Sequence, residues 1–172
     1  TTTQGITLTD TTGAKYGQSV VSCDFNGDGT KDIIMGAPNA ASGRGQVYVI
    51  YGGSALSSVD LSTFSSPTQG FIITLTGSSG LGTKVDCIPD MNGDDAEEIL
   101  ITDSTKSFFY VVYGSDSITG DMELSSEIFP AVAKVYSSTG HTMVDVVAMG
   151  SIVGDDNGEI MVSVHASASG PY

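Results

Sequence analysis

Short runs of β-branched and aromatic residues recur along the chain, separated by segments rich in Gly, Ser, Thr and Asp. In residues 6–9 polar and apolar side chains alternate, whereas residues 33–35 and 99–101 are continuously apolar. Such runs, bounded by turn-forming residues, are typical of β-strands. Long helix-forming segments are scarce, and the 22 glycines fit a chain of strands and turns. The pattern therefore predicts an all-β fold.

The strand pattern repeats. Acid-rich windows begin at residues 24, 90 and 151, at intervals of 66 and 61 residues, and short strands flank each window. A unit of this size is too small to bury a core alone. Four-stranded antiparallel units that stack radially are the blades of a β-propeller. We therefore predict three such repeats, the last one degenerate and incomplete, at residues 1–53, 69–114 and 130–172, with connecting segments at 54–68 and 115–129.

The first acid-rich window has the spacing of a calcium loop. Asp24, Asn26, Asp28 and Asp32 place side-chain oxygens at positions 1, 3, 5 and 9, and the carbonyl of Thr30 adds a ligand at position 7. Ca²⁺ takes six to eight oxygen ligands, which such a curled backbone delivers. An EF-hand needs a Glu at position 12 and two flanking helices, whereas this loop lies between predicted strands. The sequence therefore predicts a calcium-binding β-hairpin, with a metal-free Asx-rich turn as the simpler alternative.

The charge balance narrows the class of partner. The formal net charge is −14, with only six basic residues, so the chain lacks a surface that could follow a phosphate backbone. Eleven of the 20 acidic residues lie in the three windows, which favours metal binding over a merely solvated face. No apolar run reaches the roughly 18–20 residues that span a bilayer. We expect neither nucleic-acid binding nor membrane insertion.

The first repeat resembles a known family. Its Tyr-Gly pair at 16–17, its loop at 24–32 and its Gly-Ala-Pro at 36–38 are similar to the FG-GAP repeat of integrin α-subunit propellers and their relatives. In the second repeat Leu-Gly at 81–82 and Thr-Asp-Ser at 102–104 stand in these places. The resemblance implies a β-propeller with Ca²⁺ in the hairpins of some blades and a role in recognition or adhesion.

The resemblance also implies the metal ligands of both loops. They are, in the first, Asp24, Asn26, Asp28, the Thr30 carbonyl and Asp32, and in the second, Asp90, Asn92, Asp94, the Ala96 carbonyl and Glu98. Two departures weaken the second site, because Asp95 replaces Gly29 and Glu98 is one methylene longer than Asp32. Asp tolerates left-handed geometry better than most residues, so we still expect binding there, although weaker. In the third loop Ser151 and Val153 occupy the first two ligand positions, and we expect no metal.

Cys23 and Cys87 precede the two loops at nearly equivalent positions. Cysteine packs well as a small hydrophobic residue, which favours two separate buried thiols. A disulfide requires Cα atoms within about 7 Å, and the sequence leaves that alternative open.

These observations predict a calcium-binding extracellular propeller module for adhesion, recognition or self-assembly. Millimolar extracellular calcium would fill such loops, and no nucleophile elbow, phosphate loop or zinc-protease motif indicates catalysis. The expected partner is a protein or glycan ligand, or further copies of the chain. The alternatives are a structural subunit of a filament or multi-chain propeller, and part of a propeller-type carbohydrate-active enzyme. Three blades do not close a ring, so we expect a segment of a longer array or a ring shared between chains.

Overall fold

The computed structural model is built almost entirely of strands and confirms the all-β prediction. It describes residues 5–10, 12–54, 56–104, 108–124, 132–136, 141–150, 152, 154 and 158–166. The strands are β1 (Leu8–Thr9), β2 (Ser19–Cys23), β3 (Asp32–Ala37), β4 (Gln46–Ile50), β5 (Val59–Asp60), β6 (Gly70–Thr74), β7 (Lys84–Ile88), β8 (Glu98–Thr102), β9 (Phe108–Val112), β10 (Met122–Glu123), β11 (Val132–Tyr136), β12 (His141–Met149) and β13 (Glu159–Ala166). Two single turns, α1 (Ala40–Gly43) and η1 (Leu61–Thr63), complete the described elements, and neither could cross a bilayer.

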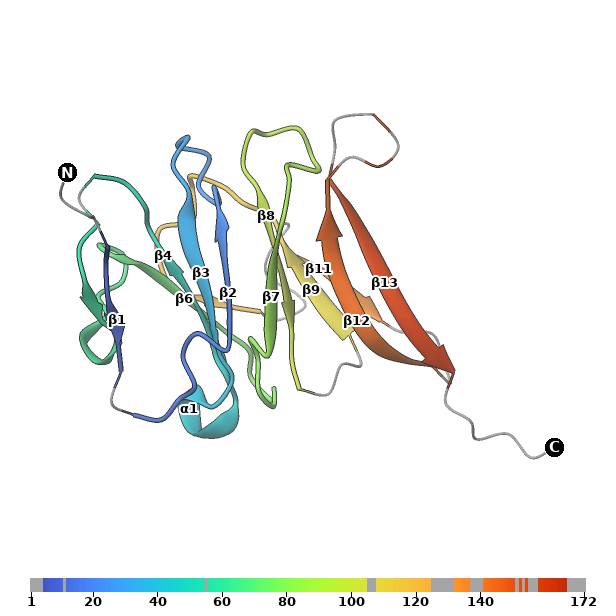
Figure 1. Ribbon diagram of the computed structural model, residues 1–172, viewed down its shortest axis with the longest axis horizontal. Coiled ribbons are helices and arrows are strands. Elements are labelled where there is room, and N and C mark those ends of the chain that lie inside the picture. Colours follow the sequence, from blue (N-terminus) through green and yellow to red (C-terminus); the bar gives the residue numbers. More distant parts are fainter. Residues whose placement is uncertain are drawn as a thin grey trace.

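The strands form two main sheets and a hairpin that lie side by side (Figure 1). The first sheet has the order β10-β6-β4-β3-β2, and the second has the order β11-β9-β8-β7. Strands β12 and β13 form a two-stranded antiparallel sheet, the C-terminal hairpin. Within each main sheet the neighbouring long strands are antiparallel, while β10 adds a short parallel pairing to β6.

The sheets are offset from the sequence repeats by one strand. Strand β6, which opens the second repeat, pairs with β4 of the first sheet, and Val49 faces Phe71 in that register. Strand β11, which opens the third repeat, pairs in the same way with β9. The second and third repeats therefore each contribute their first strand to the preceding sheet. The hydrophobic pattern identifies these strands but carries no information on which sheet they join.

Apolar side chains fill the space between the layers. One core cluster lies between the first and second sheets and includes Phe25, Phe71 and Leu81, each with no exposed surface. A second cluster lies on the opposite face of the first sheet, where β1, β5 and η1 cover it. A third cluster joins the second sheet to Val146 of the C-terminal hairpin. Face-to-face packing of successive sheets thus holds the described chain together.

The two main sheets approach each other closely at two glycines. A Cβ atom added to Gly36 would lie 2.0 Å from the carbonyl oxygen of Gly82, far inside any van der Waals contact. The backbone amide of Gly17 donates to the carbonyl of Gly36 (3.0 Å), and that of Gly82 donates to the carbonyl of Thr102 (2.9 Å). Gly36 is thus a position where backbone must pack on backbone between sheets.

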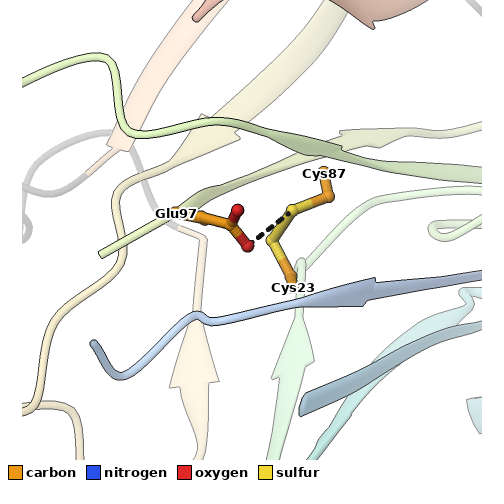
Figure 2. A group of neighbouring side chains, drawn as sticks. All are labelled: Cys23, Cys87 and Glu97. Atoms are coloured by element: carbon orange, nitrogen blue, oxygen red, sulfur yellow. Dashed lines mark hydrogen bonds between the residues drawn. A yellow bond between two sulfur atoms is a disulfide. The ribbon is translucent and has the colours of Figure 1, made fainter. Parts of the chain in front are cut away.

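The structure corrects the expectation of two separate thiols. Cys23 on β2 and Cys87 on β7 form a disulfide with their Cα atoms 5.6 Å apart, as Figure 2 shows. The bond links two strands of different sheets, so their distance depended on how the sheets pack and was not readable from the sequence. The disulfide therefore crosslinks the first sheet to the second directly beside the two acidic loops.

Candidate metal centre

The two predicted calcium loops are the turns of the β2–β3 and β7–β8 hairpins. We call residues 24–32 loop 1 and residues 90–98 loop 2. Both turns lie at the same end of their sheets (Figure 1). The strand–loop–strand setting agrees with the prediction and differs from the helix–loop–helix of an EF-hand.

In loop 1, polar side chains hold the backbone in a tight curl. The two carboxylate oxygens of Asp24 accept hydrogen bonds from the backbone amides of Asp28 (3.1 Å) and Gly29 (2.9 Å). Oδ1 of Asn26 also accepts from Asp28 N (3.1 Å), and Oδ1 of Asp28 accepts from Thr30 N (2.7 Å). This last bond lowers the pKa of Asp28, so its carboxylate stays ionised at neutral pH. The predicted ligands of positions 1, 3 and 5 thus belong to one ordered turn.

Loop 2 repeats this network despite its sequence departures. Asp94 N donates to Asn92 Oδ1 (3.0 Å), and Ala96 N donates to Asp94 Oδ1 (3.0 Å). Asp95, in the place of Gly29, adopts a left-handed φ of 68° and donates its amide to Asp90 Oδ2 (2.9 Å). Asp90 Oδ1 accepts from the amides of Asn92, Gly93 and Asp94. The replacement of glycine is therefore accommodated without a change in loop geometry.

The acid at position 9 of loop 1 is buried and is bonded to two backbone amides. The side chain of Asp32 has no exposed surface. Its Oδ2 accepts from Phe25 N (3.2 Å), and its Oδ1 accepts from Gly52 N (2.9 Å). Both carboxylate oxygens of Asp32 therefore already have a backbone donor.

The acid at position 9 of loop 2 differs in one important way. Glu98 is also fully buried, and its Oε2 accepts from Met91 N (3.0 Å). Its Oε1 is buried and has no hydrogen-bond partner in the described part of the chain. A buried carboxylate oxygen without a donor is costly, and a proton, a water molecule or a cation would each supply the missing partner.

The hydrogen bond from the amide at position 2 of the loop to the acid at position 9 also occurs in the third repeat. Ile152 N donates to Glu159 Oε2 (2.7 Å), as Phe25 N does to Asp32 and Met91 N to Glu98. The position-9 acid is therefore a structural brace of the hairpin whether or not a metal binds. The prediction that this third loop holds no metal depends on Ser151 and Val153, which lie outside the described residues.

Three carboxylates of loop 2 converge. Asp90, Asp94 and Glu98 each bring one oxygen to a group whose atoms lie within 4.8 Å of one another. The three acids of loop 1 form no equally tight group, although the structure describes all of them. Three carboxylates with one buried oxygen to spare suit a hard divalent cation such as Ca²⁺. The geometry thus favours loop 2, which the sequence had ranked second.

Burial also changes the acidity of the two position-9 groups. Burial raises the pKa of Asp32 from 3.8 to about 6 and that of Glu98 from 4.5 to about 7, against the backbone hydrogen bonds that lower them. Between the unfolded and folded pKa values the folded chain binds more protons than the unfolded chain. The free energy of unfolding of the metal-free protein must then fall as pH rises through this window.

We therefore expect the metal-free protein in excess chelator to be more stable to urea at pH 5 than at pH 7.5. The double variant Asp32→Asn/Glu98→Gln carries no titrating group at either position, so its stability should depend less on pH. Urea unfolding curves at the two pH values test this. Equal or greater stability of the wild-type protein at pH 7.5 would contradict the assignment.

Sequence reasoning missed the residue that connects the loops. Glu97 Oε2 forms an ion pair with Lys31 Nζ (2.5 Å) and accepts from Asp24 N (2.6 Å). In Figure 2 its carboxylate points to the disulfide, with 3.3 Å between Glu97 Oε2 and Cys87 Sγ. Lys31 and Glu97 both occupy position 8 of their loops, so opposite charges at equivalent positions were the signal available in the sequence.

The cluster of Cys23, Cys87 and Glu97 is not a second metal centre in this structure. Its ligand atoms lie within 4.8 Å of one another, but the two sulfur atoms are bonded to each other. Metals bind cysteine as the thiolate, which a disulfide does not offer. Loop 2 is therefore the candidate site on which the function rests.

Comparison with known families concerns the first repeat, which contains loop 1. A family sequence model described as the FG-GAP repeat matches residues 16–50. The match begins at the Tyr-Gly pair before β2, includes loop 1 and the Gly-Ala-Pro segment, and ends with β4. It is consistent with the resemblance to integrin α-like propellers, and it covers one repeat. Residues 16–50 of this chain thus match the FG-GAP repeat.

Proposed function

We propose that this chain is a calcium-stabilised part of an extracellular β-propeller that serves recognition, adhesion or assembly and has no catalytic role. The FG-GAP repeat suggests a propeller-type extracellular recognition module. The stacking of four-stranded antiparallel sheets, with their turns at one end, supports the same assignment. Calcium would then be a structural ion.

One observation carries the calcium proposal. Glu98, whose Oε1 is buried and has no hydrogen-bond partner among the described residues, belongs to a group that also contains carboxylate oxygens of Asp90 and Asp94. The ionised carboxylates repel one another at this separation, which weakens the hairpin when no cation is bound. A bound cation would neutralise them and join β7 to β8 across their turn. Asn92 and the carbonyl of Ala96 would complete the ligand set.

The pairing of β1 supports the proposal that the propeller has a further blade beside the first main sheet. Strand β6 pairs with β4 on one edge and with β10 on the other. Strand β1 pairs in parallel with β5, as β6 does with β10, and among the described residues it has no partner on its other edge. By this equivalence β1 is the outer strand of a further sheet. That sheet would come from another part of the protein or from another copy, which leaves a filament or multi-chain ring as the alternative assembly.

Calcium is expected to raise the melting temperature. A ligand that binds only the folded state adds about 2.7 kcal/mol to stability when its free concentration is 100 times its dissociation constant. About 2–4 °C corresponds to 1 kcal/mol in a domain of this size, so the expected rise is roughly 5–10 °C. Thermal unfolding in millimolar calcium and in excess chelator measures the shift.

The variant Glu98→Gln tests whether the calcium-dependent shift in melting temperature comes from loop 2. The amide keeps the size of the side chain and an oxygen acceptor for Met91 N, but it removes the negative charge. We expect this variant to fold and to lose most of the calcium-dependent shift. Identical melting of the wild-type protein with and without calcium would refute the structural role of the ion.

A further inference from the structure

We propose that the two loops bind cations cooperatively, with Glu97 as the residue through which loop 2 positions loop 1. The proposal rests on calcium binding as proposed above and concerns how the two sites act on each other. Glu97 is a positioning residue, because its carboxylate contacts the backbone of Asp24 and the side chain of Lys31 and is not one of the predicted ligands.

Glu97 forms hydrogen bonds to both backbone polar groups of Asp24, the first predicted ligand residue of loop 1. The amide of Glu97 donates to the carbonyl oxygen of Asp24 (2.9 Å), and Glu97 Oε2 accepts from Asp24 N (2.6 Å). The same oxygen pairs with Lys31, the residue before Asp32. The side chain of Glu97 in loop 2 therefore contacts loop 1 near its beginning, at Asp24, and near its end, at Lys31.

Further contacts make the two loops a single packed unit. Ser115 N donates to the carbonyl of Phe25 (2.9 Å). A Cβ on Gly114 would lie 2.5 Å from the carbonyl oxygens of both Glu97 and Phe25, so three backbone segments meet there. The Cys23–Cys87 disulfide fixes the strands that lead into the loops. Movement of one loop is thus transmitted to the other by contiguous backbone contacts.

These contacts predict positive coupling. Asp90, Asp94 and Glu98 already lie close together, and a cation bound to all three would restrict the motion of Glu98 and of the adjacent Glu97. Ordering Glu97 fixes the backbone of Asp24 before the second cation arrives, which lowers the conformational entropy lost on that binding. Electrostatic repulsion between the two bound cations opposes the positive coupling, but the ligand carboxylates reduce this repulsion. Each loop supplies three carboxylates from positions 1, 5 and 9, so an occupied loop keeps a negative charge.

Calorimetric calcium titration of single-loop variants tests the coupling. Asp94→Ala leaves loop 1 as the binding loop, and Asp28→Ala leaves loop 2. The coupling factor is the product of the two wild-type association constants divided by the product of the constants of these variants. Couplings between sites are commonly about 5–150-fold, and we expect a factor of at least fivefold in the wild-type protein.

The role of Glu97 is tested by repeating this cycle in three backgrounds. Glu97→Ala is expected to bring the coupling factor to one, and Glu97→Gln, which keeps an acceptor for Asp24 N, to restore part of it. Asp145→Ala is the matched control, because it removes the other ion pair between strands of different sheets, to Lys84 (2.6 Å), away from the loops. It should leave the factor unchanged.

The possible outcomes separate the two proposals. Two bound ions with a coupling factor of one in the wild-type protein would overturn the cooperativity while calcium binding stands. A factor of five or more that persists in Glu97→Ala would overturn the role of Glu97. Absence of calcium binding in the wild-type protein would overturn both proposals.

Discussion

Replacing Cys23 and Cys87 together by alanine is expected to lower the free energy of unfolding by about 4 kcal/mol. The two residues are 64 positions apart, so their bond closes a long loop and strongly restricts the unfolded chain. In the folded protein the bond holds β2 against β7, beside the core cluster shared by the two main sheets. Urea unfolding of the oxidised wild type and of the double variant, in chelator, measures the difference.

Two comparisons separate the crosslink from packing. Cys23 is fully buried, so alanine also removes buried volume. The double variant Cys23→Ser/Cys87→Ser places a hydroxyl group at each position instead. Reduced wild-type protein keeps both sulfur atoms and loses only the bond. We expect the alanine variant, the serine variant and the reduced wild-type protein each to lose most of this free energy of unfolding, about 4 kcal/mol. If the reduced and oxidised wild-type proteins unfold at the same urea concentration, the crosslink does not stabilise the fold.

Gly36→Ala is expected to destabilise the protein by about 3 kcal/mol, the upper end of the usual range for an overpacked core. The added Cβ would lie 2.0 Å from the carbonyl oxygen of Gly82 and 2.9 Å from its carbonyl carbon. These are backbone atoms of the neighbouring sheet, so no side-chain rotation relieves the clash. The two main sheets must separate locally, which loosens the core between them. Thermal and urea unfolding measure the loss.

Gly120→Ala is the matched control, since a Cβ there would have no heavy atom within 4 Å. Its stability should lie within about 0.5 kcal/mol of the wild type, as for most exposed substitutions. A Gly36→Ala protein as stable as this control would show that the sheets do not pack as closely as described.

The close approach at Gly36 gives the family motif a physical meaning. The glycine of Gly-Ala-Pro in one repeat packs on the glycine of the aromatic-Gly position in the next, here Gly82 after Leu81. The two halves of the motif therefore meet across the boundary between sheets. In the second sheet Thr102 occupies the place of Gly36, so the same backbone contact cannot form with the chain that follows.

The local elements were predictable because short-range chemistry determines them. Alternating and continuous apolar runs identified β2, β3, β7 and β8, and the Asp-x-Asn-x-Asp spacing identified both hairpin loops. The side chains of Asp24 and Asp90 curl their own loops through bonds to amides at most five residues away. Such contacts form within one segment, so they can be read from residue types and spacing.

The relation between the loops was not predictable because it depends on how the sheets pack. The disulfide and the pairing of Glu97 with Lys31 each arise where β7 and loop 2 lie against β2 and loop 1. The two pairs are 64 and 66 residues apart in the sequence, and their distances follow from the packing of the two sheets across a shared core.

The sequence by itself determined an all-β chain of repeated strands, the two acidic hairpin loops and the FG-GAP character of its first repeat. Tertiary structure alone decided that the second and third repeats give their first strands to the preceding sheets, that Cys23 bonds to Cys87, and that loop 2 gathers its carboxylates more closely than loop 1. The physical reason is the range of the interactions. Strand and turn preferences act within a few residues, whereas sheet pairing, crosslinks and the burial of Glu98 depend on segments that meet only in the folded protein.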